Sequence, residues 1–254
     1  MKYTAVVLAG SRPGSDPFAD QFGSDLKALI PVGGEPMVLR PVRELLLSRS
    51  IGDILVLAQA PDRIAAVLPK DARIQIATSG SSIANTMLQL CEDPTIQWPL
   101  LITTADHALL DGATIEEICN AAQDADVAIG VVKQSLLLQR FPHAKRTWLK
   151  FRGGAYTGAN LFALRSPKVA SAIELWAGGE QSRKKGWRLI SLLGPTVLLG
   201  TLLRLFSIDQ VLDRVGHRLG LVIKAVRLSN PLAGVDIDKI EDHALAEGVI
   251  EGRA

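Results

Sequence analysis

The sequence predicts an α/β fold in which a mostly parallel sheet is covered by helices on both faces, giving three layers. In the first half of the chain, short apolar runs alternate with segments whose apolar residues recur at helical spacing. The strand-like runs are apolar throughout rather than at every second position, as in parallel strands buried on both faces. With 254 residues, of which 48% are hydrophobic and 21% charged, the chain can bury such a sheet.

The elements of the first half follow one another in strand–helix order. The predicted strands cover residues 4–8, 54–58, 74–77, 100–103 and 127–132. The predicted helices cover residues 36–50, 63–68, 81–90 and 114–122, the third with Ser81 or Ser82 as its N-cap. Helical crossovers between successive strands make those strands parallel.

The second half of the chain loses this rhythm. The pattern predicts a turn entering a strand within residues 148–162, a helix over 208–219 capped by Ser207, a strand over 221–228, and a turn followed by a helix within 234–247. We expect a single domain over residues 1–254, with an apolar and basic helical insertion at about 178–220.

The composition excludes several classes of protein. Two cysteines, Cys91 and Cys119, are too few for a disulfide scaffold or a four-cysteine zinc site. The first residues lack the apolar stretch and the cleavage pattern of a signal peptide, so we expect a cytoplasmic protein. Aromatic residues make up only 5% and do not interleave the basic ones, which argues against nucleic acid as a partner.

The net charge of +2 hides an uneven distribution. Residues 139–152 carry five basic and no acidic side chains, and residues 178–230 carry nine basic and three acidic ones. Such stretches are typical of proteins with an anionic partner, such as phosphate, a nucleotide or a lipid surface. Solvated loop charge explains them equally well.

The polar loop after the first strand predicts a phosphate site. Gly10 and Ser11 let backbone N–H groups approach an anion. Arg12 adds a guanidinium group that can contact phosphate in a forked geometry, and Lys27 adds a point charge at the far end of the loop. In parallel sheets, ligands bind at the carboxyl ends of the strands, where this loop begins. The loop has neither the GxxxxGK[ST] nor the GxGxxG pattern, which argues against a P-loop ATPase and an ordinary nicotinamide dehydrogenase.

Both ends of this loop resemble the opening of the MobA-like NTP transferases. The matching residues are Leu8, Ala9, Gly10 and Arg12 at its start, and Lys27, Ala28, Leu29, Gly34, Pro36 and Met37 at its end. Ser11 stands where that family has a second glycine, and the loop is longer than usual. The resemblance implies the glycosyltransferase-A-type (Rossmann-like) nucleotidyltransferase fold. It also implies that a nucleotide is bound by Leu8, Ala9, Gly10, Ser11, Arg12 and Lys27.

Two further segments resemble binding segments of the same family. Gly80 and Ser82 follow the third strand, where the family borders the nucleobase; a plain helix N-cap is the alternative. Asn160 lies in a segment that borders the acceptor in the family; a bend in a strand explains it equally well.

The resemblance also implies a magnesium site. Asp106 follows the fourth strand and matches the family's metal-binding aspartate, with a turn-stabilising role as the alternative. Either Asp236 or Asp238 would supply a second carboxylate, and we favour Asp236. One or two carboxylates, completed by water and substrate oxygens, suit Mg²⁺.

These residues predict nucleotidyl transfer, because the sequence has no GxSxG elbow and no Cys–His signal for covalent catalysis. An NMP group would pass from an NTP to a phosphorylated or hydroxyl-bearing small molecule with release of pyrophosphate. Lys27, Arg12 and Asp106 would be the catalytic residues.

Two alternatives remain open. A glycosyltransferase using a nucleotide-sugar would employ Asp236 and Asp238 as an Asp-x-Asp motif, and a non-catalytic module would bind nucleotide alone. CTP, GTP and UTP are all compatible with the sequence, and so are many acceptors.

The uncharged run at residues 189–203 is shorter than the ~20 residues that span a bilayer. We expect it to form helices packed on the sheet or a contact in a homodimer. Because basic residues precede it, peripheral membrane contact through residues 183–206 is the alternative.

Overall fold

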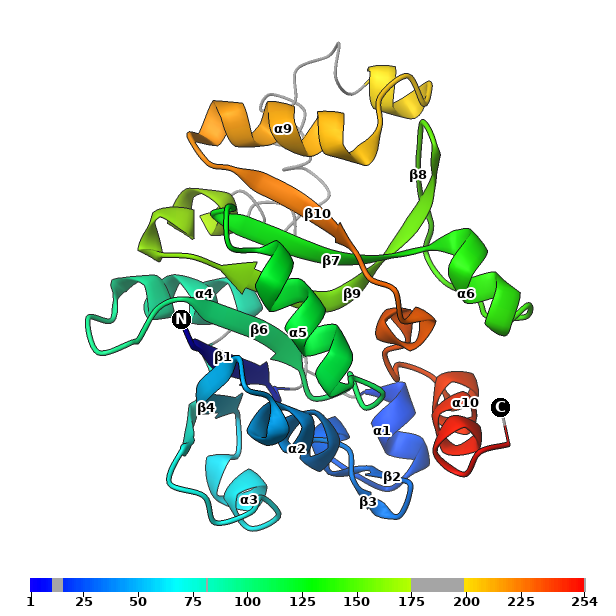
Figure 1. The fold of residues 1–254 in the computed structure, drawn as a ribbon. Coiled ribbons are helices and arrows are strands. Elements are labelled where there is room, and N and C mark those ends of the chain that lie inside the picture. The colour runs from blue at the N-terminus through cyan, green and yellow to red at the C-terminus, as the bar shows by residue number, and fades with distance from the viewer. Residues whose placement is uncertain (11–15, 81, 175–198, 254) are drawn as a thin grey trace.

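The computed structural model describes residues 1–254 except 11–15, 81, 175–198 and 254. In this part of the chain, eight strands form one sheet in the order β10–β7–β9–β6–β1–β4–β5, with β8 paired to β9 (Figure 1). The strands are β1 (Tyr3–Leu8), β4 (Ile51–Ala58), β5 (Ile74–Thr78), β6 (Leu100–Thr104), β7 (Val127–Lys133), β8 (Leu149–Phe151), β9 (Gly154–Leu164) and β10 (Ile223–Arg227).

The sheet is mostly parallel, as predicted. Strand β1 pairs in parallel with β4 and β6, β4 with β5, and β7 with β10. Strand β9 lies between β6 and β7 and runs antiparallel to both. The carboxyl ends of β1, β4, β5 and β6 therefore share one edge, and β9 interrupts the parallel order beside it.

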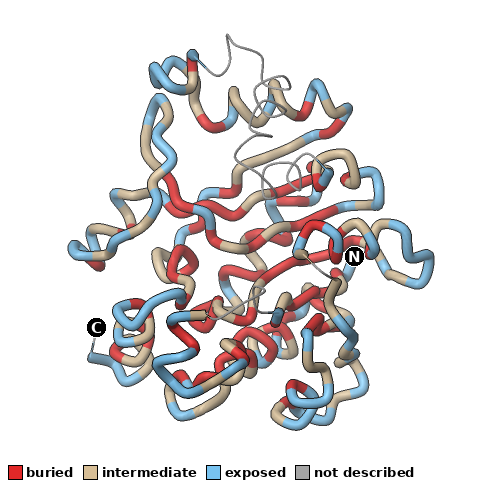
Figure 2. Tube along the Cα trace, turned by 180° about the vertical axis from the view of Figure 1, so that it is seen from behind, coloured by how far each residue is buried: buried red, intermediate tan, exposed pale blue. Residues whose placement is uncertain are grey.

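Helices cover both faces of the sheet. They are α1 (Pro17–Gln21), α2 (Leu39–Leu47), α3 (Pro61–Ala65), α4 (Ile83–Glu92), α5 (Gly112–Ala121), α6 (Gln134–Arg140), α9 (Ile208–Leu219) and α10 (Ile240–Ile250), with short 3₁₀ turns η1 (Lys27–Leu29), η2 (Pro167–Val169) and η4 (Pro231–Gly234). Ala5 and Val7 of β1 belong to a large core with α2 and α5, whereas Val6 belongs to a second core with α4. Figure 2 shows the buried residues concentrated along the strands between these layers. The uniformly apolar strands thus reflect burial on both faces, and the predicted α/β class is confirmed.

The helix predicted over residues 36–50 is shorter in the structure because a small hairpin occupies its start. Strands β2 (Pro31–Val32) and β3 (Glu35–Pro36) are joined by Gly33 and Gly34, with φ of 63° and 77°. These left-handed conformations suit a two-residue hairpin turn. Helix α2 begins only at Leu39.

The predicted caps are present, and two helices were not predicted. Ser207 and Gln210 form a capping box at the start of α9, and the hydroxyl of Ser82 accepts from the backbone of Asn85 at the start of α4. Helices α1 and α6 are only five and seven residues long, so their periodicity is too short to detect.

Part of the apolar run and the first part of the expected insertion lie outside the described residues. From residue 199 onward the chain forms one helical turn and then α9, which packs along β10. Among the residues that the structure describes, no helix has both the length and the apolar character needed to cross a membrane.

Candidate functional site

The ammonium group of Lys27 lies between two carboxylates from distant parts of the chain. Lys27 Nζ is 2.6 Å from Asp106 Oδ2 and also forms an ion pair with Asp238 Oδ1. The side chains of Lys27 and Asp106 are 15% and 18% exposed, whereas that of Asp238 is 52% exposed. We call these three residues the Lys27 cluster. It lies at the carboxyl end of β6, on the edge where a ligand is expected.

The charges of the Lys27 cluster do not cancel, because one cation faces two carboxylates. Burial alone would lower the pKa of Lys27, but Asp106 and Asp238 outweigh it and raise that pKa above its usual value. Lys27 is therefore protonated at neutral pH. The excess negative charge of the cluster suits a further cation.

The hairpin holds Lys27 in place. Lys27 is the first residue of η1, and the next residue, Ala28, is buried together with Ile30. The carbonyls of Ala28 and Ile30 accept from the backbone N–H groups of Val38 and Met37 at 3.0 and 2.9 Å. The backbone on the C-terminal side of Lys27 is thus fixed between the hairpin and the core.

Asp106 is held in a tight turn directly after β6. The Thr104 hydroxyl donates to Asp106 Oδ1, and the His107 N–H donates to the Thr104 carbonyl at 3.2 Å. The Ile237 N–H donates to the Asp106 carbonyl at 3.1 Å and ties the C-terminal segment to the turn. Burial lowers the pKa of His107 to about 4, so its imidazole is neutral at neutral pH.

A second cluster surrounds Arg146, whose side chain is only 9% exposed. Its Nη1 is 3.2 Å from Asp236 Oδ1, and its Nη2 is 2.8 Å from Asp242 Oδ1. Asn160 Nδ2 donates to Asp236 Oδ2 at 3.2 Å. Burial raises the pKa of Asp236 to about 6, helped by the charge of Asp238 and opposed by Arg146. We call Arg146, Asp236, Asp242 and Asn160 the Arg146 cluster.

Asn160 reaches this cluster because β9 is distorted there. Its φ is 45°, a left-handed conformation that is uncommon for residues other than glycine. The register between β7 and β9 shifts between Ile129 and Val131, opposite this part of β9. Bulges of this kind re-aim side chains beside functional sites. For Asn160, the sequence left two alternatives, a bend in a strand and a residue that borders the acceptor. The structure has the bend.

The Lys27 cluster fits a divalent cation better than Asp236 does. Asp106 and Asp238 present carboxylate oxygens to the same ammonium group, so a small cation placed there could contact both. Both oxygens of Asp236 already have partners, Arg146 and Asn160. In the described part of the chain, no three His, Cys, Asp or Glu residues converge as metal ligands. The geometry therefore favours Asp238 over the Asp236 that the sequence suggested.

The loop predicted to bind phosphate is only partly described. Leu8 is the last residue of β1, and the N–H of Ala9 donates to a carbonyl of β4 at 2.8 Å. Gly10 follows at the exposed end of the strand. Ser11 and Arg12, both predicted to bind nucleotide, lie outside the described residues.

The segment after β5 lies against the end of β1. A side chain added at Gly10 would come within 3.5 Å of Ser79 Oγ, a buried hydroxyl for which the described residues show no hydrogen-bond partner. Gly80 has no room for a side chain, since an added Cβ would lie 3.0 Å from Thr86 Oγ1. Its N–H donates to that oxygen at 2.9 Å, and Ser82 caps α4. In the structure Gly80 and Ser82 thus shape the wall next to Gly10.

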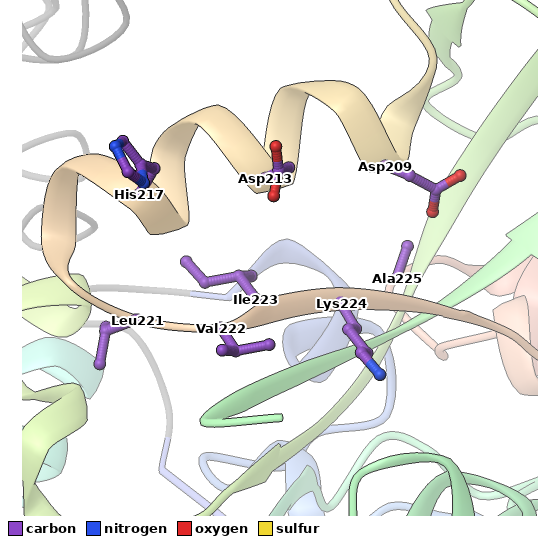
Figure 3. A pocket seen from close by; sticks show the side chains of 8 residues that line it. All are labelled: Asp209, Asp213, His217, Leu221, Val222, Ile223, Lys224 and Ala225. Carbon is purple, nitrogen blue, oxygen red and sulfur yellow. The ribbon is translucent and has the colours of Figure 1, made fainter. Parts of the chain in front are cut away.

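A pocket of about 470 Å³ lies elsewhere, between α9 and β10. Figure 3 shows Asp213 and His217 on the α9 side, with Ile223 and Ala225 rising from β10 toward the helix. Of its charged lining residues, Lys224 pairs with Asp124 and Asp209 pairs with Arg227. None of its lining residues belongs to the Lys27 or Arg146 cluster. We therefore place the candidate site at the two clusters, where charge and strand ends converge.

The sequence matches the family model of the MobA-like NTP transferase domain over residues 5–190. The chain belongs to this family. Membership confirms the resemblance inferred from the loop residues and identifies the chain as a nucleotidyltransferase. No curated protein matches the sequence.

Solved structures of similar fold agree with this assignment. A hypothetical transferase from Thermus thermophilus is 29% identical, with a TM-score of 0.78 over 96% of this chain and 100% of its own. A 4-diphosphocytidyl-2C-methyl-D-erythritol synthase from Anaerococcus prevotii is 13% identical, with a TM-score of 0.62 over 98% of this chain and 99% of its own. A CMP:2-keto-3-deoxy-manno-octonic acid synthetase, solved with CTP, is 11% identical, with a TM-score of 0.62 over 99% of this chain and 100% of its own. The last two show the shared fold alone.

Sequence reasoning missed two residues near the candidate site. Arg146 was counted only as one of the five basic residues of the 139–152 stretch, and its burial could not be read from that count. Ser79 precedes Gly80 directly, so its place beside the nucleotide segment was a signal that could have found it. Both side chains depend on tertiary contacts for their position.

Proposed function

We propose that this nucleotidyltransferase moves an NMP group from an NTP to a phosphorylated or hydroxyl-bearing small molecule in a Mg²⁺-dependent reaction. The observation that carries the proposal is the Lys27 cluster. One protonated lysine and two carboxylates meet at the end of β6, and Gly10 lies just after the neighbouring strand β1. Cation, carboxylates and an open strand end are the parts that phosphoryl chemistry requires.

In the proposed reaction, an oxygen of the acceptor attacks the α-phosphorus of the NTP. The bond to the acceptor forms, the bond from the α-phosphorus to the bridging oxygen breaks, and pyrophosphate leaves. When the acceptor is a hydroxyl, its proton goes to solvent. The residues of the chain align the reactants and neutralise charge that develops on the leaving group.

We assign the site residues as follows. Lys27 would contact the phosphates as a point charge, and Arg12 would assist from the loop after β1. Asp106 and Asp238 would hold Mg²⁺, which would supply positive charge to the phosphate oxygens. Leu8, Ala9, Gly10, Ser11, Gly80 and Ser82 would border the nucleotide, and Asn160 would border the acceptor.

We further infer that residues 1–254 act as one domain. The family match ends at residue 190, yet Asp238 contacts Lys27 and Ile237 bonds to Asp106. The C-terminal segment thus completes a site that the matched part begins. In this proposal the expected helical insertion of residues 178–220 begins within the matched part and ends before the C-terminal segment.

The test is pyrophosphate release by the purified protein from each NTP with Mg²⁺ and a panel of sugar phosphates and polyols. CTP comes first, because one structure of the same fold was solved with it. We expect release with one NTP and one acceptor class. Asp106→Ala should abolish it, whereas Asp124→Ala, a change at an exposed carboxylate, should not.

Other outcomes of this test point elsewhere. Release of a nucleoside diphosphate from a nucleotide-sugar would indicate a glycosyltransferase. Binding of an NTP, read as a rise in melting temperature, without turnover of any acceptor would indicate a non-catalytic module.

A further inference from the structure

Four exposed leucines lie in the segment that precedes α9, and a fifth lies on the neighbouring β8–β9 hairpin. Leu199, Leu202, Leu203 and Leu205 lie within seven residues of one another, and Leu149 lies on β8; each is at least 55% exposed. We call these five residues the leucine patch. Single exposed apolar residues are ordinary on protein surfaces, but contiguous groups mark interaction sites.

The backbone of the segment turns these leucines outward. Residues 199–202 form a helical turn, and the N–H groups of Leu203 and Leu205 donate to the carbonyls of Leu199 and Gly200 at 2.9 and 2.7 Å. The ring of Phe206 packs against the inner side of this turn. It lies so close to Gly200 that a Cβ added at Gly200 would be 2.2 Å from the ring. The leucines therefore remain on the outside.

The segment is fixed next to the tip of the β8–β9 hairpin. The Arg152 N–H donates to the Phe206 carbonyl at 2.9 Å, and the Arg214 guanidinium lies 4.1 Å from the Phe206 ring centroid. Figure 1 shows the helical turn before α9 beside the end of β8. Leu149 lies about 10 Å from Arg152 along the strand, at roughly 3.3 Å per residue. The patch is thus part of a folded surface held by the hairpin.

The two sequence stretches that carry the leucine patch contain basic but no acidic residues. Lys150, Arg152 and Arg204 are exposed, and the sequence has no acidic residue in 139–152 or 199–206. The next acidic residue along the chain, Asp209, pairs with Arg227. Among the described residues, no ion pair involves Lys150, Arg152 or Arg204. Exposed leucines beside such cations fit a partner surface with an apolar interior and a negatively charged exterior.

We propose that the leucine patch docks the protein on an anionic lipid surface. The leucines would enter the boundary between headgroups and acyl chains, and Arg152 and Arg204 would contact lipid phosphates. A second copy of the chain fits less well. In a symmetric dimer the same patch faces itself, so its cations would meet like charges.

The proposal is tested by co-sedimentation of the full chain with vesicles. One set contains phosphatidylcholine alone, and the other contains phosphatidylcholine with phosphatidylglycerol. We expect binding to the second set only, weakening as salt is added. The double variant Leu202→Glu/Leu203→Glu should bind roughly tenfold more weakly or worse, because it removes apolar contact and adds repulsion.

The matched control is Leu47→Glu, which changes a leucine that is 72% exposed on α2. Figure 1 places α2 at the end of the sheet opposite α9, so this variant should bind vesicles like the wild type. The melting temperature and pyrophosphate release in the absence of lipid should be unchanged in both variants. A loss of lipid binding with unchanged solution activity would thus leave the proposed function intact.

Three results would overturn the proposal. They are equal binding to both vesicle sets, equal binding by the double variant and the wild type, and a dimer in sedimentation velocity that the double variant dissociates. The last would assign the patch to self-association.

Discussion

The Lys27 and Arg146 clusters carry the same charges but differ in how the cation holds its two carboxylates. Each joins one cation to two carboxylates. In the first, a lysine presents a compact charge beside the half-exposed Asp238; in the second, an arginine holds both carboxylates with its planar fork. A point charge can change partners when a phosphate arrives, whereas a fork fixes the geometry. In the proposed function, this difference separates Lys27, which would act on substrate, from Arg146, which would position its neighbours.

The largest expected effect is on turnover when the lysine is removed. Lys27→Ala should lower the rate of pyrophosphate release by about 10²–10³-fold, because a positioned charge at the reacting phosphates is lost. Its melting temperature should stay close to that of the wild type. Lys224→Ala, which removes a lysine from an exposed ion pair, should retain full activity. A Lys27 variant with a tenth or more of the wild-type rate would exclude this role.

The arginine should show the reverse pattern, with stability as the main readout. Arg146→Ala leaves Asp236 and Asp242 without their shared cation and should lower the free energy of unfolding by about 3 kcal/mol in urea titrations. Arg43→Ala, in an exposed pair with Glu35, should cost less than about 1 kcal/mol. Equal losses of unfolding free energy in the two variants would show that the buried and the surface ion pairs contribute equally to stability.

His107, beside the Lys27 cluster, and Asp236, in the Arg146 cluster, should respond in opposite directions to acid. His107, next to Asp106, has a pKa of about 4 in the folded chain, below its unfolded value, so between these two values the unfolded chain binds more protons. Stability due to His107 is therefore lost as pH falls, by about 2 kcal/mol between pH 8 and pH 5. For Asp236, the folded pKa of about 6 is above the unfolded one. Its contribution to the free energy of unfolding therefore rises by about 1 kcal/mol as pH falls over the same range.

Urea titrations at several pH values check this comparison. His107→Gln should flatten the loss of stability below pH 6.5, and Asp236→Asn should steepen it. Profiles of the two variants that both parallel the wild type would contradict the assignment.

The smallest effect is expected at Asn160. Asn160→Ala removes the hydrogen bond to Asp236. It also places alanine, whose side chain cannot form a hydrogen bond, at φ 45°, so the free energy of unfolding should fall by about 1–2 kcal/mol. Asn160→Gly removes the same hydrogen bond but tolerates the backbone, so it should lose less. Both variants should raise KM for the acceptor if Asn160 borders it. Unchanged KM in both would limit Asn160 to a structural role.

The sequence predicted the parts of the site that follow from local patterns. Lys27 and Asp106 could be found because one ends a polar loop and the other follows a buried strand, and both match family motifs. The choice between Asp236 and Asp238 could not, since alternation in an extended segment puts both on one side. Our proposal of Asp238 rests on the ion pair between Arg146 and Asp236, and nothing local marks Arg146 as buried.

The fold shows the same division. Uniformly apolar runs identified the strands on both sides of the first helices, and Ser207 marked the start of α9. The antiparallel course of β9 was not predicted, because periodicity gives a strand without its direction. The bulge that turns Asn160 toward Asp236 likewise arises from pairing with β7.

The contact between Lys27 and Asp238 spans 211 positions of the chain. A ribosome must therefore release the chain as far as Asp238 before the second carboxylate can reach the lysine. Any fragment that stops before this point, including one cut where the family match ends, would keep Asp106 but lack Asp238. If Asp238 holds Mg²⁺ as proposed, the unfinished protein would be unable to consume NTP during its synthesis.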